Sequence, residues 1–575
     1  MSGKRVGSDP SGRVVRRKFL GTAAAATGVV AATALLEACA SSSPPASSPA
    51  ASSAPAASSA APAAGNASPA AASAPAAASA ASPVYTPIPT VTAGIKHEGT
   101  ILANIEDDYS HASGMAAVAK EYMKLYPKVE IKIDPKPIEG YIDWARAQVV
   151  GGTKASYLRD CTCPDLVAAG KFVALDSYLS KVNPYTNKVW QTMFQDGTIV
   201  PDSNTGQVVQ FNMFRVYVLW FYNKQLWDQV GLKEPPKTWT EFMKVLQTFQ
   251  DAKILPTPMA GDYDGWARMG ISWIDRITAD AYARDSINVI RAQPGDYDYN
   301  PKIDANWTYN VKDPYNDAFG KVTRNPVRMI QAFRDGKLSV DNPGYRDWWR
   351  HLKQFLKYIQ PGFLGVSRDT ARQLFLTGKA GVWLDATWFF SQFEHFMGDS
   401  ANGLKRFDYG TFNLVDVDDS KLVQSPTREI DNPAGYWVIP KKSQAQNDLE
   451  VDFLQFLTEP KMAGLLVNTT LNDPKYDLVG PPTLKDVTVP KVWEDRFSVI
   501  GGRGQGEGGA PGIHGIDPQS QREWVALAQQ YATDKLSEDD FFKKFEASIM
   551  QAVPRFAKSQ GYDLDHPEKK PNPPK

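Results

Sequence analysis

Residues 214–242 read FRVYVLWFYNKQLWDQVGLKEPPKTWTEF and combine two patterns that decide the fold class. Residues 214–223 are a mostly apolar run, which predicts a buried β-strand. Further along, Thr238 and Glu241 have the spacing of a helix capping box, and Phe242, Val245 and their neighbours fall on one helical face. A strand followed by a capped amphipathic helix predicts an α/β protein.

The same alternation opens the folded part of the chain. Residues 101–105 predict a strand, 114–126 a helix and 129–133 a second strand. Two strands joined through a helix predict a parallel pair. Further helices are predicted at 325–336, 348–359, 367–378, 448–457 and 537–553. Residues 256–342 are dense in Asp, Tyr, Asn and Trp with weak periodicity, which predicts loops or an insertion.

The composition predicts a large protein with no nucleic-acid partner. The 575 residues suffice for two or more lobes. Basic and acidic residues number 63 each, and beyond residue 84 they number 57 and 61, so the folded body is mildly acidic. The 6 histidines and 3 cysteines lack the spacing of a metal site, and no cofactor is expected. Cys161 and Cys163 form an isolated C-x-C for which a disulfide and two free thiols are both open.

Residues 1–38 have the pattern of an export signal. Arg16 and Arg17 precede an apolar run rich in Ala and Gly that ends at Leu36. VRRKFL resembles a twin-arginine signal for Tat export, and LEAC at residues 36–39 resembles the lipobox of bacterial lipoproteins, from which Glu37 departs. The sequence therefore predicts lipidation at Cys39, with a transmembrane anchor as the alternative.

Residues 39–92 predict a disordered, lipid-anchored linker. From residue 40 to residue 83 every residue is Ala, Ser or Pro except Gly65 and Asn66, so too little apolar surface exists to offset the entropy of ordering. A flexible coil of this length spans roughly 35–40 Å. Such a linker would keep the folded body close to a membrane.

Five stretches, taken in chain order, carry a family resemblance. They are GMAAVAKEYMKLYPKVEIKID (114–134), PDLVAAGKFVALDSYL (164–179), WFYNKQLWDQVGLKEPPKTWTEF (220–242), LFLTGKAGVWLDATWFF (374–390) and AGYWVIPKKSQAQNDLEVDFLQFLTEP (434–460). They resemble the bacterial extracellular solute-binding proteins of the sugar ABC-transporter family, the maltose-binding type. The resemblance extends over roughly residues 100–553.

This resemblance implies a type II-like periplasmic-binding-protein fold, with two α/β lobes, hinge strands and an interlobe ligand cleft. Lobe 1 would comprise residues 93–213 plus 410–460, lobe 2 residues 214–409 plus 461–556, and residues 557–575 a C-terminal extension. The solute would be captured by hinge closure. The protein would be a monomeric receptor on the outer face of the cell membrane, with no catalytic residues, delivering a sugar to an ABC permease and its ATPase.

The abundant aromatic residues favour an oligosaccharide as the sugar. Two alternatives stay open: the same fold binding a non-sugar solute, such as a glycerol-phosphodiester or a peptide, and a secreted glycan-active enzyme that uses two carboxyl groups.

Sugar contacts are expected where polar groups and aromatic rings meet at strand ends, because sugars present both hydroxyls and apolar C–H faces. By position in the family pattern the contacts would be Glu106, Asp107, Tyr109, Tyr141, Trp144, Asp160, Trp266, Asp385, Thr387, Trp388, Tyr436, Trp437 and Trp524. Arg503 and Glu507 are added from the segment GGRGQGEGGAPG, which starts at Gly501 and predicts a flexible loop at the cleft rim. Trp348 and Trp349 are expected in the core.

Overall fold

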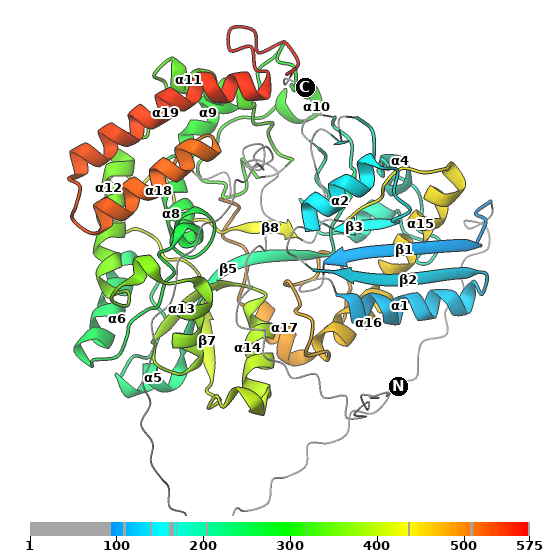
Figure 1. Cartoon of the computed structure of the whole chain (residues 1–575), viewed down its shortest axis with the longest axis horizontal. Helices are drawn as coiled ribbons and strands as arrows, with labels where there is room; N and C mark the ends of the chain where they lie inside the picture. The colour runs from blue at the N-terminus through cyan, green and yellow to red at the C-terminus, as the bar shows by residue number, and fades with distance from the viewer. Residues whose placement is uncertain are drawn as a thin grey trace, which may run out of the picture.

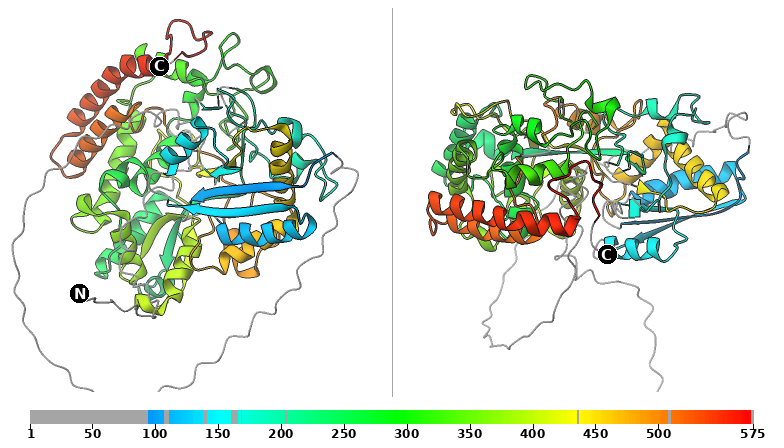
Figure 2. Two further views of the ribbon diagram at one scale, coloured as in Figure 1. Left: turned by 45° about the vertical axis from the view of Figure 1, so that its right-hand side comes forward. Right: turned by 90° about the horizontal axis from the view of Figure 1, so that it is seen from above.

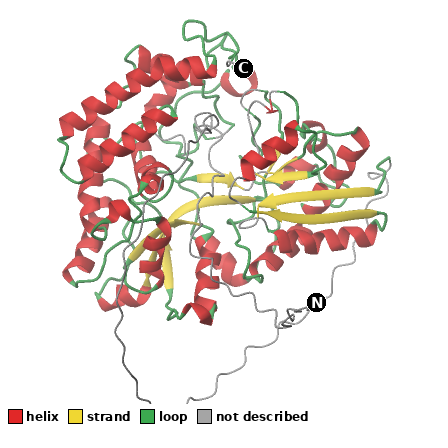
Figure 3. Ribbon diagram, viewed as in Figure 1, coloured by secondary structure: helices red, strands yellow, loops and turns green. Residues whose placement is uncertain are grey.

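The strands of the protein form two sheets that meet near the middle of the molecule, with helices outside them (Figures 1 and 3). The computed structural model describes residues 94–106, 111–137, 141–159, 166–167, 169–202, 205–318, 320–434, 437–506 and 510–572. We call the halves built on the two sheets the first lobe and the second lobe.

The sheet of the first lobe has the strand order β2-β1-β3-β9-β4. The strands are β1 (Gly99–Glu106), β2 (Val129–Lys136), β3 (Tyr157–Arg159), β4 (Gln210–Phe211) and β9 (Trp437–Val438). β1 runs parallel to β2 and β3, which confirms the predicted parallel pair, and β9 runs antiparallel to β3 and β4.

The helices of the first lobe are tied together in part by one buried carboxylate. They are α1 (Ala112–Leu125), α2 (Tyr141–Val150), α4 (Asp176–Leu179), α15 (Gln444–Leu457) and α16 (Pro460–Leu471). Asp452 on α15 accepts hydrogen bonds from the hydroxyls of Tyr122 and Tyr185, each at 2.6 Å. Segments more than 250 residues apart in sequence therefore share one acceptor in the core.

The sheet of the second lobe is built on β5 (Phe214–Asn223), which has the predicted bounds. β5 pairs antiparallel with β6 (Val382–Ala386), β7 (Tyr409–Phe412) and β8 (Asp431–Ala434). The strand is buried along its length except for the half-buried Arg215 and Tyr222. A strand covered on both faces explains the nearly continuous apolar run in the sequence.

Helices surround this second sheet. They are α5 (Lys224–Gln229), α6 (Trp239–Asp251), α7 (Tyr263–Ala267), α8 (Ile271–Asp280), α9 (Ile287–Ile290), α10 (Pro301–Asp304), α11 (Pro326–Arg334), α12 (Pro343–Phe355), α13 (Arg368–Leu376), α14 (Phe389–Gly398), α17 (Lys491–Phe497), α18 (Pro518–Ala532) and α19 (Glu538–Gln560). The capping box of Thr238 and Glu241 begins α6 as predicted. α18 and α19 pack side by side along the outer edge of the second lobe (Figure 2).

Three chain segments connect the lobes. The chain passes from β4 to β5 through Asn212 and Met213, and it returns from β8 to β9. The third segment, residues 478–484, is bridged to Phe214 at Pro482 and to Phe194 at Leu484. Gly480 is required there, because a Cβ at this position would lie 2.0 Å from the carbonyl oxygen of Arg215. The connection is thus closely packed at residues 214–215 and 480–482.

Residues 256–342, for which the sequence predicts loops or an insertion, contain α7, α8, α9, α10 and α11, and of these α11 corresponds to a predicted helix. The weak apolar periodicity of this region has its cause in buried polar side chains. Asp275 on α8 is fully buried and accepts hydrogen bonds from Trp348 at 2.6 Å and from His514 at 3.0 Å. Buried polar residues that pair with distant segments therefore give these helices little apolar periodicity.

The predicted lobe boundaries stay a prediction. β7 straddles the proposed boundary at residue 409 and pairs with β5 along its whole length. α19 runs without interruption past residue 556 to Gln560, although it contains Pro554.

A buried ion network fixes the segment before β8. Arg428 donates to Asp280 at 2.6 and 2.8 Å and to Asp317 at 2.6 Å. Arg284 and Arg324 also donate to Asp317, at 3.2 and 3.1 Å. Arg428 is 2% exposed, so its removal would leave the buried carboxylate of Asp280 without its arginine partner and take one of three arginines from Asp317.

We predict that Arg428→Met lowers the free energy of unfolding by about 3–5 kcal/mol, because it leaves the buried carboxylate of Asp280 without its arginine partner. Urea denaturation measures the change. The control Arg334→Met breaks exposed ion pairs to Asp335 and Asp565 and is expected to cost less than about 1 kcal/mol. Equal losses in the two variants would contradict the role given to Arg428.

Candidate functional site

The carboxyl ends of the first-lobe strands mark one side of the candidate site. β1, β2 and β3 are parallel, with Glu106 paired to Lys136 and Asn104 paired to Leu158, so their ends lie at the same edge of the sheet. This edge points toward the second lobe (Figure 1). Ligands of open α/β sheets bind at such edges.

A cluster of charged and polar side chains marks the other side, where β5 and β8 pair. We define the hinge cluster as Arg215, Tyr217, Glu429, Asp431 and Arg503. Tyr217 and Asp431 are directly opposite each other in the register and share a side-chain hydrogen bond. The Nε of Arg215 donates to Asp431 at 2.6 Å. Asp431 therefore has partners on β5 for its carboxylate.

Glu429 differs from the other members of the hinge cluster. It lies two residues before Asp431, and its side chain is 3% exposed. Neither of its carboxylate oxygens has a hydrogen-bond partner among the described residues. Burial raises the pKa of Glu429 to about 7, with the negative charge of Asp431 as the second cause, while Arg503 and Arg215 act in the opposite direction.

The Gly-rich segment covers this cluster rather than forming an exposed rim. Gly506 donates its backbone N–H to the Glu429 carbonyl at 2.8 Å, and the side chain of Gln505 donates to the Asp431 carbonyl at 2.7 Å. Gly504 has φ +97°, and a Cβ there would lie 2.4 Å from the carbonyl oxygen of Pro314. Only glycine permits this approach. Arg503 donates to the Asp416 carboxylate and to the Thr427 carbonyl.

Asp385, Thr387 and Trp388 lie together beside the hinge cluster. Asp385 is fully buried and accepts from Arg368 at 2.6 and 2.7 Å and from Trp388 at 2.9 Å. Thr387 donates its backbone N–H to the Tyr217 carbonyl at 3.0 Å. Asp385 therefore holds Trp388 in place, and the role of these residues as ligand contacts stays a prediction.

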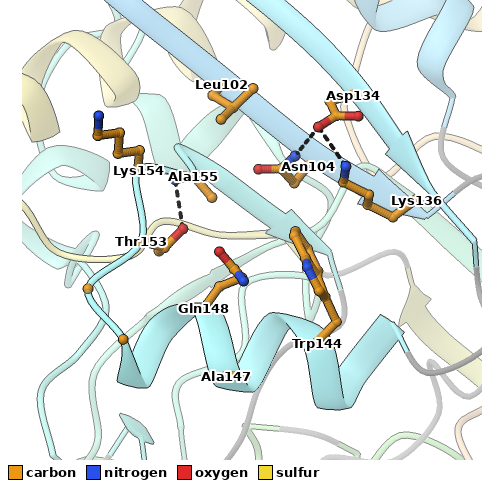
Figure 4. A pocket seen from close by; sticks show the side chains of 12 residues that line it. Leu102, Asn104, Asp134, Lys136, Trp144, Ala147, Gln148, Thr153, Lys154 and Ala155 are labelled. Carbon is orange, nitrogen blue, oxygen red and sulfur yellow. Dashed lines mark hydrogen bonds and ion pairs between the residues drawn. The ribbon is translucent and has the colours of Figure 1, made fainter.

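A separate pocket lies in the first lobe, between α2 and the strands β1 and β2. It has a volume of about 540 Å³ and is lined by Leu102, Asn104, Asp134, Lys136, Trp144, Ala147, Gln148, Gly151, Gly152, Thr153, Lys154 and Ala155. Trp144 and Gln148 rise from α2 toward the strands (Figure 4). Asp134 accepts from Asn104 and pairs with Lys136, both at 2.8 Å. The half-buried Trp144 is thus the predicted contact that lines this pocket.

Sequence and structure comparisons agree with this architecture. Residues 109–308 match the family described as bacterial extracellular solute-binding protein. This match agrees with the resemblance to solute-binding proteins seen in the sequence, whereas the twin-arginine signal and the lipobox stay predictions. No curated protein sequence matches the chain.

Solved structures with the same two-lobe fold are similar to this chain. A chitin oligosaccharide binding protein is 15% identical, with 80% of this chain and 100% of that chain covered and a TM-score of 0.53. The cyclic α-maltosyl-1,6-maltose binding protein from Arthrobacter globiformis is 14% identical, with 80% and 100% covered and a TM-score of 0.52. RafE in complex with raffinose is 14% identical, with 79% and 100% covered and a TM-score of 0.50.

Other predicted ligand contacts lie in the cores of the two lobes. Trp266 and Trp524 are fully buried, with ring centroids 6.2 Å apart, and both pack against Trp349 of α12. Tyr141 is 1% exposed and donates its hydroxyl to the Asn104 carbonyl at 2.6 Å. Trp437 is buried near Tyr157, with centroids 6.2 Å apart. The structure does not bring these four residues together.

Several predictions fall outside what the structure describes. Glu106 ends β1, but its side chain is not described. Among the residues singled out in the sequence analysis, those that lie outside the described ranges are Cys39, Asp107, Tyr109, Asp160, Cys161, Cys163, Tyr436 and Glu507. Within the described ranges, no helix combines the length and the apolar character needed to cross a membrane, and no cluster of His, Cys, Asp and Glu is arranged to hold a metal ion.

The sequence analysis missed four members of the hinge cluster: Arg215, Tyr217, Glu429 and Asp431. One pattern could have pointed to them. Arg215 is the single charged residue in the apolar run 214–223, and a charge in a buried strand requires a partner. Its partner Asp431 lies 216 residues further along the chain, so no local pattern identifies it.

The stability of the ligand-free protein should depend on Glu429. Because the folded-state pKa of about 7 lies above the ordinary glutamate pKa of 4.5, the unfolded chain releases this proton first. The folded state therefore loses stability as the pH rises from about 4.5 to about 7. The Glu429→Gln variant has no ionisable group at this position and does not lose stability in this way. The stability gained by the variant over the wild type should therefore grow by roughly 2–3 kcal/mol between pH 5 and pH 8. Urea denaturation at both pH values measures it, and a difference independent of pH would contradict the burial of an unpartnered carboxyl.

Proposed function

We propose that the protein is the extracytoplasmic substrate-binding lipoprotein of an ABC importer, which captures an oligosaccharide between its lobes and delivers it to a permease. The observation that carries this proposal is the family match of residues 109–308 on a two-lobe fold whose lobes are joined by three strand segments. Such a connection permits closure around a solute. The solved relatives named above are described by the saccharides that they bind, which favours a sugar as the solute.

The arrangement of polar groups agrees with a neutral, hydroxyl-rich solute. The arginines of the hinge cluster are already paired, Arg215 with Asp431 and Arg503 with Asp416. An anionic solute such as a phosphodiester would need a cation that is not engaged in this way. The buried Glu429, in contrast, offers acceptors for hydroxyl donors.

We predict that an oligosaccharide stabilises the purified protein against heat. A ligand present at 100 times its Kd adds about 2.7 kcal/mol to the free energy of unfolding. Thermal melting with raffinose, maltotriose, N,N′-diacetylchitobiose and xylotriose measures the shift, with glycerol phosphodiesters and short peptides as the non-sugar arm. A shift with a non-sugar solute alone would support the alternative solute class. Release of cleaved sugars would support the glycan-active enzyme.

The attachment of the protein to the membrane is proposed to depend on Cys39, at the end of the lipobox-like LEAC. Cys39→Ser should move the protein from the membrane fraction into the soluble fraction, because no acyl chain can be attached. The control Cys161→Ser should stay in the membrane fraction. If the Cys39→Ser protein remains membrane-bound and unprocessed like the wild type, the segment is a transmembrane anchor and the lipoprotein proposal is wrong.

A further inference from the structure

Glu429 is held in a fixed position at the junction of the lobes. Its backbone is bridged to Gln505, and Gly506 donates to its carbonyl oxygen at 2.8 Å. The strand that follows it, β8, pairs with β5 from Asp431 to Ala434. Glu429 is therefore fixed by the Gly-rich segment on one side and by β8, which pairs with the connecting strand β5, on the other.

The neighbouring charges do not pair with its carboxylate. Arg215 donates to Asp431 at 2.6 Å, and Arg503 donates to Asp416 and to the Thr427 carbonyl. The neighbouring carboxylate, Asp431, repels a second negative charge. Within the described part of the chain, Glu429 thus has two buried acceptor oxygens and no donor.

A buried carboxylate without a hydrogen-bond donor destabilises the folded protein unless a ligand supplies the donor. Burying an acceptor without a hydrogen bond costs about 1–3 kcal/mol, and more when the group is charged. Natural proteins keep few groups of this kind, and each calls for a specific explanation. The tyrosine hydroxyls nearby do not relieve it: Tyr217 shares a hydrogen bond with Asp431, and Tyr315 interacts with the backbone of Gly502 and Gly504.

We propose that Glu429 accepts hydrogen bonds from two adjacent hydroxyls of the bound sugar and selects solutes that carry such a pair, an inference that rests on the proposed function. A carboxylate has two oxygens that can accept from two donors side by side, and hydrogen bonds to an ionised acceptor are about twice as strong as neutral ones. Asp431 and Arg215 act as positioning residues. They pair with each other, so that Arg215 does not pair with the Glu429 carboxylate.

This role makes sugar affinity depend on pH. In the ligand-free protein the carboxyl titrates near neutral pH, where Asp431, Arg215 and Arg503 are the charged groups that influence it, and Tyr217 and Tyr315 lie close by. Since the ionised form accepts both hydroxyls, the sugar binds more tightly as the pH rises through about 7. A neutral amide at this position has no such dependence.

Isothermal titration of the full chain tests the proposal, with raffinose, maltotriose, N,N′-diacetylchitobiose and xylotriose as probes at pH 6 and pH 8. For the sugar that binds best, we expect wild-type affinity at pH 8 to be roughly tenfold higher than at pH 6, which follows from a pKa of about 7. Glu429→Gln should bind at least about tenfold more weakly than the wild type at pH 8 and show no change between the two pH values.

The matched control is Glu450→Gln, which alters a fully buried glutamate on α15 that pairs with Lys442 in the first lobe. This variant should retain the wild-type affinity and pH profile. Wild-type affinity and an unchanged pH profile in Glu429→Gln would overturn the inference while leaving sugar binding intact. Binding of no sugar by the wild type would instead overturn the proposed function, and this inference with it.

Discussion

The structure depends on β5, the strand from which the second sheet and the connection between the lobes are both built. β6, β7 and β8 pair with it, and its first residue also bridges to Pro482 of the third connecting segment. The carbonyl of Arg215 approaches Gly480 so closely that no side chain fits there. A change in the first four residues of β5 therefore affects the sheet, two connecting segments and the polar groups between the lobes.

Buried polar groups at this junction need a hydrogen-bond or ion-pair partner, either within the protein or on a bound solute. The ion pairs of Arg215 with Asp431 and of Arg428 with Asp280 and Asp317 satisfy most of the charge around β8. The buried carboxylate of Glu429 stands apart, with no donor among the described residues. Under the proposed function, a solute bound at the junction of the lobes would supply the missing donors.

The elements predicted correctly are those whose sequence signals lie within a few neighbouring residues. The βαβ unit of β1, α1 and β2, the bounds of β5 and the capping box of α6 follow from periodicity and spacing within a few residues.

The helix α8 was missed because Asp275 and Asp280 are buried by pairing with Trp348, His514 and Arg428, which lie 73 to 239 residues away. Family position placed Asp385, Thr387 and Trp388 beside the junction, whereas Trp266 and Trp524, chosen in the same way, lie in the core of the second lobe. Glu429 could not be found from sequence, since its distinguishing property is the absence of a partner in three dimensions.

The most direct test of the central claim, that the solute binds at the junction of β5 and β8, is a crystal structure of the protein with its best-binding oligosaccharide. The account predicts electron density for the sugar between the lobes, with two adjacent hydroxyls within hydrogen-bond distance of the Glu429 carboxylate. Density confined to the pocket beside Trp144, with the junction of β5 and β8 empty of sugar, would contradict it.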